Sequence, residues 1–375
     1  MKVLVLGGGV IGVTSAWALA RAGHEVTLLE RHAGVAQETS FANGGQISWS
    51  SASPWAAPGM PTQALAWLLR PPAPLLWRPN LDEQQWLWLW RMLRQCTGPR
   101  YLVNKERQLR LARYSHERLV QLRADAGITY DERTRGLLVL YRERRQLRAA
   151  EREQRLLERL GIDSRLLTAD DCRAQEPALA ASPARISGGL YFPYDESGDC
   201  RRFTETLSLL AQRQGVIIET STTVQKLVSD GDTVREVITD RGPRRADSVV
   251  VALGCESARL LRPLGLHLPI YPVKGYSITV PVIADALAPQ GTLTDETYKT
   301  VITRLGPNLR VAGTAEVSGY DSSIDPERIE LLHRVVGAVV AEFHLHRFGA
   351  GSQAQQLVAE ADAENRSLRF ENLAD

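Results

Sequence analysis

Three glycines near the start of the chain have the spacing of a dinucleotide-binding turn. Gly7, Gly9 and Gly12 form a Gly-x-Gly-x-x-Gly pattern. In this pattern the first glycine permits a tight turn, the second lets the backbone approach a pyrophosphate, and the third lets a helix pack closely on a strand. Glu30 lies eighteen residues after Gly12, where its carboxylate can accept hydrogen bonds from a ribose diol. The pattern predicts a bound dinucleotide, whose phosphates would be favoured by the amides of the helix N-terminus.

The elements that must position these residues can be read on either side of the turn. Lys2–Leu6 is a Val- and Leu-rich run typical of a buried parallel strand, Val10–Ala20 has the apolar period of a helix, and His24–Glu30 reads as a second strand. Together they fit the size of one βαβ unit; a purely structural glycine turn is the alternative. Arg31 would suit the 2′-phosphate of NADP, but the acid before it disfavours that phosphate, so NADP is the weaker interpretation.

Two further stretches suit contact with a cofactor. The loop Gln37–Ser48 contains hydroxyls, an amide and the paired Gly44 and Gly45, so its backbone amides can wrap a pyrophosphate or a flat ring. An ordinary surface turn is the alternative for this loop. Asp247–Leu253 is an apolar run that ends on Gly254, where the backbone can approach a dinucleotide a second time.

Length, charge and cysteine usage exclude several classes of protein. A chain of 375 residues is long enough for two domains. The net charge is +2 and basic residues interleave with acidic ones, so we expect no nucleic-acid partner. The four cysteines lie far apart with no metal-ligand spacing, which favours a reducing compartment and predicts no metal site. The sequence shows neither a secretory signal nor an uncharged apolar run of ~18 residues, so no transmembrane helix is predicted.

One segment, Ser50–Cys96, is rich in tryptophan and proline. It holds six of the eight tryptophans, and indole combines an apolar body with a polar tip that suits a membrane interface. Core packing together with a subunit contact is the alternative.

The remaining pattern predicts helices and strands that support the fold. The expected helices are Gln84–Arg94, Asn104–Ala126, Arg142–Leu160 and Arg201–Gln214, the last capped by Asp199, and the expected strands are Gly136–Tyr141, Val216–Glu219 and Thr223–Val228.

Several motifs together resemble the D-amino acid dehydrogenases, FAD enzymes of the D-amino acid oxidase-like group. The resemblance covers Met1 to about Val336, and its later motifs are more specific than the glycine pattern. These motifs are the glycine turn with Glu30, the loop Glu38–Gln46, Gly189–Thr204, Val249–Gly254, Pro272–Ser277, Asp295–Lys299, Ile302–Arg304 and Arg310–Glu316.

The resemblance implies an α/β fold, with a Rossmann-type FAD-binding domain and an interleaved α+β substrate domain containing a mixed sheet. We expect residues 1–60 and 161–262 in the FAD-binding domain, and residues 61–160 and 263–320 in the substrate domain. Residues 321–375 would form an incomplete or divergent C-terminal part. The expected FAD contacts are Val3, Leu4, Leu6, Gly7, Gly8, Gly9, Val10, Ile11, Gly12, Glu30, Arg31, Ser40, Asn43, Gly44, Gly45, Gln46, Val224, Ala252 and Gly254.

The resemblance also implies a reaction. Family members transfer hydride from the α-carbon of a D-amino acid to FAD, the imine hydrolyses to a 2-oxo acid and ammonia, and the electrons pass to a membrane quinone. Because a neutral amine can give hydride directly, the protein must mainly bind a carboxylate and shield the ring. The candidates on the substrate-side strands are Lys274, Tyr276, Tyr298 and Arg304; each could instead be a plain sheet residue.

The C-terminal end departs from the family pattern. Family members carry a Gly-x-Arg-Pro-x-Thr-Pro-Asp-Gly stretch, with the usual carboxylate anchor, and a glycine-rich turn with tryptophan that closes over the flavin. This chain shows neither after Val336; a truncation or an altered reading frame gives such a pattern. His344 and His346 share a strand face but lack a third ligand, so we interpret them as incidental.

The sequence thus predicts a D-amino acid dehydrogenase, with D-alanine as the expected substrate and a quinone or another respiratory-chain component as the acceptor. The location expected is cytoplasmic, with peripheral contact to the cytoplasmic face of the inner membrane, and the chain could form a homo-oligomer. One alternative is a flavin oxidase of glycine, sarcosine or proline. The other is a catalytically impaired relic that retains flavin weakly because the closing segment is missing.

Overall fold

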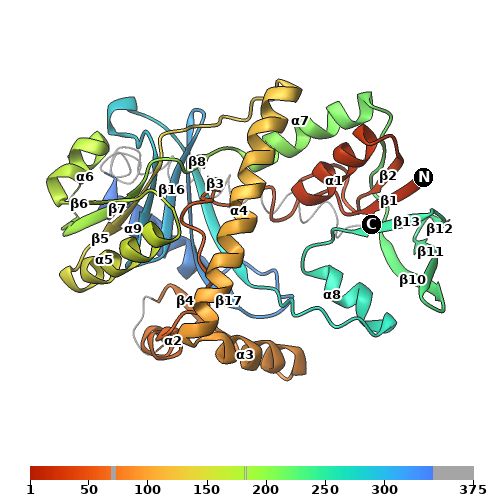
Figure 1. Ribbon diagram of the computed structural model, residues 1–375, viewed down its shortest axis with the longest axis horizontal. Coiled ribbons are helices and arrows are strands. Elements are labelled where there is room, and N and C mark those ends of the chain that lie inside the picture. Colours follow the sequence, from red (N-terminus) through yellow and green to blue (C-terminus); the bar gives the residue numbers. More distant parts are fainter. Residues whose placement is uncertain (69–72, 181, 183, 341–375) are drawn as a thin grey trace.

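The computed structural model describes residues 1–68, 73–180, 182 and 184–340 of the chain. Two sheets organise these residues, one of four strands and one of eight. In Figure 1 the smaller sheet lies near the N-terminus at the right and the larger sheet at the left, with the long helix α4 (Gly98–Ala126) between them. The expected α/β class with a mixed sheet is confirmed.

The smaller sheet is parallel throughout, with the order β13-β1-β2-β9. Its strands are β1 (Lys2–Leu6), β2 (Glu25–Leu29), β9 (Ile217–Glu219) and β13 (Ser248–Val251). On one face Val3 and Val5 pack against α1 (Val10–Arg21) and α7 (Cys200–Arg213). The predicted strand, turn, helix and strand are therefore confirmed.

A three-stranded antiparallel sheet covers the other face. It consists of β10 (Val224–Asp230), β11 (Thr233–Thr239) and β12 (Gly242–Arg244). Leu227 and Val237 pack in one apolar cluster with Leu4, Leu6 and Leu29. Because β1 is covered on both faces, its apolar residues run without alternation. α8 (Glu256–Leu261) follows β13 and contacts β10.

The larger sheet has the order β14-β17-β16-β15-β5-β7-β6, and β4 also pairs with β17. Its strands are β4 (Leu75–Trp77), β5 (Leu137–Tyr141), β6 (Arg165–Leu167), β7 (Gly188–Phe192), β14 (Lys274–Pro281), β15 (Thr292–Asp295), β16 (Thr300–Leu305) and β17 (Asn308–Val317). The pairs β15-β5 and β17-β4 are parallel and the others antiparallel. α9 (Pro326–Val339) packs on this sheet through Leu332 and Val336.

The remaining helices lie between and around the sheets. α2 (Met60–Leu68) and α3 (Glu83–Gln95) precede α4, and α5 (Arg144–Arg159) and α6 (Ala169–Gln175) contact β7. α4 begins six residues before the predicted start, because Pro99 is compatible with the first turn of a helix. It ends at Gly127, which has φ 59°. β3 (Gln46–Ile47) pairs with β8 (Glu196–Ser197), and Pro177–Leu179, Arg262–Leu264 and Asp285–Leu287 are 3₁₀ turns.

The order of elements corrects one predicted domain boundary. β6 and β7 belong to the larger sheet, although they fall within the segment 161–262 that was expected in the FAD-binding domain. The smaller sheet and its helices resume only at Cys200, where α7 begins. A short apolar strand such as Gly188–Phe192 carries no sign of the sheet it will join, which explains the error. Residues 263–320 supply β14 to β17 of the larger sheet.

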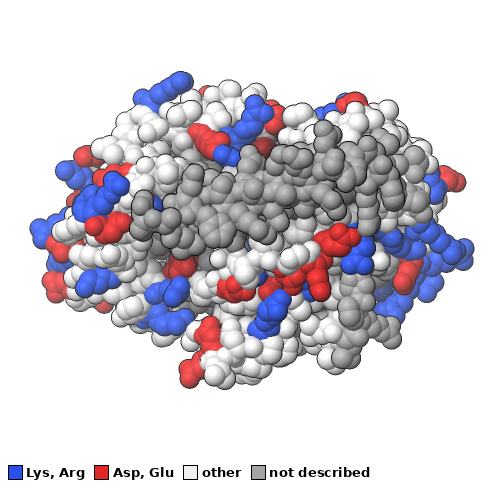
Figure 2. Space-filling model, turned by 180° about the vertical axis from the view of Figure 1, so that it is seen from behind, with Lys and Arg blue, Asp and Glu red and all other residues white. Residues whose placement is uncertain are grey.

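Of the predicted C-terminal part, α9 lies within the described residues, whereas residues 341–375, with His344 and His346, lie outside them. Among the described helices, none combines the length and the apolar character needed to cross a bilayer. Figure 2 shows the molecule from behind, where basic and acidic side chains of the described residues are interspersed. This mixture agrees with the small net charge of +2.

Candidate active site

The glycine turn between β1 and α1 is fixed by contacts that leave no room for side chains at two positions. Gly7 has φ +106°, and a Cβ atom there would lie 2.6 Å from the Ala252 carbonyl oxygen. At Gly12 a Cβ atom would lie 1.8 Å from the Gly7 carbonyl oxygen. At Gly9 a Cβ atom would meet only Ser40 Oγ, at 3.5 Å. The structure therefore leaves open space at the glycine expected to face a pyrophosphate.

The N-terminus of α1 suits an anion. Gly9 is the N-cap and offers no side-chain hydrogen bond, and the first turn contains no acidic residue. Ser40 Oγ accepts a hydrogen bond from Val10 N at 3.0 Å, which ties the start of the polar loop to the helix. Backbone amides and the helix dipole at this end favour a bound phosphate, so these residues fit a dinucleotide.

Glu30 lies at the end of β2 with its carboxylate against the turn. Its Oε2 accepts a hydrogen bond from Gly8 N at 2.6 Å, and its Oε1 accepts one from His32 N at 2.8 Å. A Cβ atom at Gly8 would lie 2.8 Å from the same Oε2, so a side chain at residue 8 would displace the Glu30 carboxylate. The buried acid is thus brought to the glycine turn, where its contact with a ribose diol stays a prediction.

Beside it, Arg31, His32 and Glu38 form a charged cluster. Glu38 Oε1 lies 2.8 Å from His32 Nε2 and also pairs with the Arg31 guanidinium. The hydrogen bond from His32, together with that from Arg31, lowers the pKa of Glu38 to about 2. Arg31 is therefore engaged by a carboxylate of its own chain, and the cluster lines the large cavity described next.

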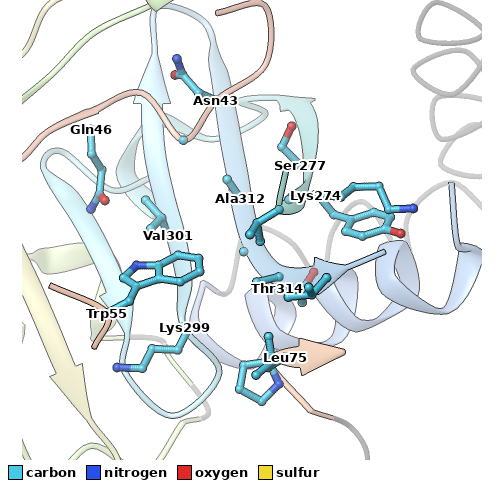
Figure 3. A pocket seen from close by; sticks show the side chains of 18 of the residues that line it. Asn43, Gln46, Trp55, Leu75, Lys274, Ser277, Lys299, Val301, Ala312 and Thr314 are labelled. Carbon is cyan, nitrogen blue, oxygen red and sulfur yellow. The ribbon is translucent and has the colours of Figure 1, made fainter. Parts of the chain in front are cut away.

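A cavity of about 3470 Å³ opens next to the nucleotide turn. Part of its floor is a row of three small side chains on adjacent strands. The row consists of Val301 on β16, Ala312 on β17 and Ser277 on β14, which lie opposite one another in the sheet. Figure 3 shows this row with Asn43 and Gln46 on one side and Trp55 and Lys299 on another. Such a flat surface between polar loops can accommodate a ring system and a small substrate.

The loop that the sequence predicted to wrap the cofactor is held onto this floor by side chains from distant elements. Ser277 Oγ donates a hydrogen bond to the Ala42 carbonyl at 2.7 Å, and Arg310 Nη1 donates one to the Asn43 carbonyl at 3.1 Å. A Cβ atom at Gly44 would lie 3.5 Å from Ala312 Cβ. The loop therefore lies directly on the strands of the larger sheet.

The two ends of the loop are held as well. The guanidinium of Arg201 lies 4.2 Å from the centroid of the Phe41 ring, and Gly198 N donates to the Gly45 carbonyl at 2.9 Å. Gln46 Nε2 donates to Thr294 Oγ1 at 3.1 Å. We refer to these contacts on residues 41–46 as the loop clamp.

Arg310, which the sequence did not single out as a site residue, is a second cation of this clamp beside Arg201. Its Nε donates to Thr279 Oγ1 at 2.7 Å, and no described carboxylate forms an ion pair with it. Burial lowers the pKa of the Arg310 guanidinium. The signal that could have found it is its place at the start of the Arg310–Glu316 motif. A partly buried cation that pairs with no described carboxylate suits a site for an anionic group.

Lys274 and Tyr276, two of the predicted catalytic residues, both line the cavity. They meet at Glu316, whose side chain is buried: Tyr276 Oη donates to Glu316 Oε2 at 2.5 Å, and Lys274 Nζ lies 3.3 Å from Oε1. Arg78 Nε donates to the same Oε1 at 2.9 Å. Burial opposes ionisation, but hydrogen bonds from Tyr276 and Arg78 lower the pKa of Glu316. Burial and that hydrogen bond raise the pKa of Tyr276.

The other two predicted catalytic residues are not brought to the cavity. Neither Tyr298 nor Arg304 is among the described residues that line it. Arg142 lies over the Tyr298 ring, 5.1 Å from its centroid. Arg304 forms an ion pair with Asp285, and on β16 it is separated by an odd number of positions from the floor residue Val301. Because strand residues alternate between faces, Arg304 points to the opposite side, and its assignment as an anchor is corrected.

The remaining predicted cofactor contacts divide into two groups. The side chains of Val3, Leu4 and Leu6 are buried under the turn, and Val224 packs with the last two; they support the turn instead of presenting a surface. Gly254 has φ +55°, and a Cβ atom there would have nothing within 4 Å. The side chain of Ile11 is exposed. Ala252 contributes a backbone contact, since its N–H donates a hydrogen bond to the Leu6 carbonyl at 2.9 Å.

Two cavity residues that were not predicted as site residues have strained backbones. Lys299 has φ 53° and Thr314 has φ 54°, and a left-handed conformation is unusual for a β-branched residue. The buried Thr314 Oγ1 has no hydrogen-bond partner among the described residues. Strain of this kind persists where surrounding structure imposes it, often at ligand sites.

Comparison with known proteins decides the family. The model of the family described as FAD dependent oxidoreductase matches residues 2–361. The chain is 50% identical over 339 residues to a D-amino acid dehydrogenase of Rhizorhabdus wittichii, covering 90% of this chain and 82% of that protein. It is 48% identical over 342 residues to a D-amino acid dehydrogenase of Neisseria meningitidis, covering 91% and 82%.

The chain belongs to the FAD-dependent oxidoreductases, and its close relatives there are D-amino acid dehydrogenases. FAD is the cofactor, as the sequence predicted. Solved structures support the fold: glycine oxidase from Geobacillus kaustophilus has a TM-score of 0.68 at 22% identity, covering 92% of this chain and 79% of that one. L-proline dehydrogenase from P. horikoshii has a TM-score of 0.65 at 17% identity, covering 91% and 77%.

Proposed function

We propose that the chain catalyses the FAD-dependent oxidative deamination of D-amino acids to 2-oxo acids and ammonia. The observation that carries this proposal is the identity of about half the residues to D-amino acid dehydrogenases over four-fifths of their length. The geometry supports it, since the glycine turn, Glu30 and the clamped loop fit FAD, and a cavity of suitable size adjoins them.

Bound FAD supplies the two-electron acceptor for the α-carbon–hydrogen bond of the substrate. The chain's own residues position the reactants: the loop clamp fixes residues 41–46, and the row of Ser277, Ala312 and Val301 gives a flat floor. Lys274 is the predicted catalytic residue that brings a positive charge to the cavity, and its Nζ lies 3.3 Å from Glu316 Oε1. We propose that Lys274 contacts the carboxylate of the substrate. The imine product then takes up water and releases ammonia.

D-Alanine is the substrate that we propose for the first test. Purified protein reconstituted with FAD should reduce a soluble dye such as dichlorophenolindophenol when D-alanine is added, with pyruvate and ammonia formed in equal amounts. L-Alanine serves as the matched control. Yellow flavin absorbance without turnover of any D-amino acid would contradict the proposal, and faster turnover of glycine, sarcosine or proline would favour the alternative oxidase. Failure to retain flavin would favour the impaired relic.

We propose further that electrons pass to a quinone, and that the chain attaches to the cytoplasmic face of the inner membrane. The support is the exposure of Trp86 and Trp90, at 48% and 52%, and the absence of buried residues in α2. Trp88 instead packs near Tyr271, with ring centroids 5.9 Å apart, so the core alternative fits this residue. A homo-oligomer contact on the same surface is the competing explanation.

Charged replacements separate these explanations. Trp90→Glu should release the protein from membranes without lowering its thermal stability, because the side chain is about half exposed. Trp86→Glu should also release the protein but lower its stability, because Trp86 Nε1 donates a hydrogen bond to the Asn80 carbonyl at 2.9 Å and its ring packs edge-on against Trp77. The matched control is Trp88→Glu, which should destabilise the fold through the lost contact with Tyr271. Release that always accompanies unfolding would support core packing, and a change in oligomeric mass on size-exclusion chromatography would support a subunit contact.

A further inference from the structure

A second, smaller hollow lies outside the cavity, where α3 ends and α4 begins. It has a volume of about 520 Å³. Its lining consists of Trp90, Arg91, Arg94, Gln95, Pro99, Arg100, Val103, Asn104 and Arg107. Four of these residues are arginines and none is acidic. Figure 1 places this junction at the lower end of α4, far from the smaller sheet.

The four arginines pair with no acidic residue among those that the structure describes. None of them forms an ion pair within the described part of the chain, although 22 such pairs occur elsewhere in it. A guanidinium carries five N–H donors; among the four, only Arg100 uses one on a described acceptor, donating Nη1 to the Arg94 carbonyl at 2.8 Å. The hollow therefore presents an uncompensated positive charge with free donors, the requirement for binding a phosphate.

The hollow is also partly ordered by its own contacts. The Arg94 guanidinium lies 4.6 Å from the centroid of the Trp90 ring, and Asn104 Nδ2 donates to Gln95 Oε1 at 3.2 Å across the junction of α3 and α4. These contacts hold two of the basic and aromatic groups in place before any ligand binds, which lowers the entropy cost of binding.

Exposed apolar side chains lie in the basic hollow and between it and the large cavity, and we call these side chains the apolar rim. Trp90 of α3 and Val103 of α4 line the hollow and are 52% and 47% exposed. Leu93 and Leu102, on the same two helices, line the cavity next to it and are 53% and 47% exposed. Exposed apolar groups beside clustered arginines are typical of surfaces that enter the interface of an anionic bilayer. An acidic protein segment or a nucleic acid would use the arginines but would leave these apolar side chains in water.

We propose that this hollow and its apolar rim bind the phosphate headgroups of anionic phospholipids at the surface of a bilayer. The inference rests on the membrane attachment proposed above and names the lipid class and the residues. It also gives the attachment a direction, because the other side of α3 faces the large cavity through Trp88, Leu89 and Met92. A bilayer bound at the hollow therefore lies next to the apolar end of the cavity.

The test measures binding of the FAD-loaded protein to two kinds of vesicle, phosphatidylcholine alone and phosphatidylcholine with about 30% phosphatidylglycerol. Arg91→Gln/Arg107→Gln should weaken binding to the anionic vesicles about thirtyfold, since two charges close to the surface are lost. The matched control is Arg148→Gln/Arg155→Gln on the exposed surface of α5, which line neither hollow nor cavity. It should retain binding within about twofold, and added salt should weaken the wild type.

Several outcomes would overturn the inference. These are equal binding of the wild type to both kinds of vesicle, unchanged binding of Arg91→Gln/Arg107→Gln, and an equal loss in the control. Inorganic phosphate that binds while anionic vesicles do not would also overturn it. Dye-coupled oxidation of D-alanine is measured on the same samples and should be unchanged, so failure of the inference is distinguishable from failure of the proposed function.

Discussion

The glycine turn and the loop clamp contact the same cofactor region but are built in opposite ways. The tightest contact of the turn is between neighbouring residues, since a Cβ atom at Gly12 would lie 1.8 Å from the Gly7 carbonyl oxygen, and one distant atom, the Ala252 carbonyl oxygen, lies 2.6 Å from the Cβ position of Gly7. Two contacts of the clamp come from Ser277 and Arg310, which lie 235 and 267 residues from the groups they hold. The turn is therefore sensitive to any added atom, and the clamp is sensitive to changes far along the chain.

The largest effect is expected where the turn is tightest. Gly12→Ala places a Cβ atom 1.8 Å from the Gly7 carbonyl, so α1 must move off β1. We expect a loss of roughly 4 kcal/mol or more in unfolding free energy, measured by urea denaturation of the apoprotein. A variant with wild-type stability would show that the helix shifts freely.

The matched variant at the open glycine should affect the cofactor and spare the fold. At Gly9 a Cβ meets only Ser40 Oγ, at 3.5 Å, and the backbone has φ −72°, which any residue adopts. Gly9→Val should therefore keep thermal stability without FAD and lose most of the flavin absorbance after purification. Full flavin occupancy in Gly9→Val would contradict the placement of the pyrophosphate here.

A smaller effect is expected at the clamp. Arg310→Met removes two hydrogen bonds and a partly buried charge, and hydrogen bonds that involve charged groups contribute roughly 1.5–3 kcal/mol. FAD affinity of the apoprotein, measured by calorimetry, should fall by about ten- to hundredfold. Ser277→Ala loses one neutral bond and serves as the control, with a smaller loss. If the positive charge is what favours FAD, Arg310→Lys should bind FAD more tightly than Arg310→Met. Equal losses of FAD affinity in the two variants would show that the hydrogen-bond geometry of the guanidinium is what matters.

The smallest effect is expected on the pH dependence of stability, through the protonation of Glu38. Because the pKa of Glu38 is lowered to about 2, its ionised form adds stability that is present above its unfolded pKa and is lost as pH falls through the folded value. The side chain is 50% exposed, so screening limits the contribution to about 1 kcal/mol or less. Urea unfolding between pH 6 and about pH 2 should show a shallower pH dependence for Glu38→Gln than for the wild type. Identical slopes would mean that His32 and Arg31 do not favour the charged form.

The same contrast explains what could be predicted from the sequence. The βαβ unit around Gly7 and Glu30 depends on contacts within about thirty residues, so periodicity and glycine spacing sufficed. The cap at Asp199 is equally local, and its side chain accepts from Arg202 N at 3.0 Å.

Long-range pairing set the limits of prediction. β5 joins the larger sheet beside β15, with Leu137 opposite Thr292, and no local signal specifies that partner. The face on which Arg304 lies depends on the register of β16 with β17, where Arg304 pairs with Leu309. A shift of one residue would have turned it toward the cavity. The sequence therefore identified the two motifs that contain Arg304 and Arg310 but not which of the two arginines lines the cavity.

The loop clamp also has a consequence for synthesis of the chain on the ribosome. The glycine turn leaves the ribosome early, yet Asn43 must wait for Arg310, 267 residues later. At roughly 5–20 residues per second this interval is on the order of ten to fifty seconds. During that time the loop has neither its sheet nor its cation, so flavin capture is a late event that follows completion of β17, whatever the state of the N-terminal strands.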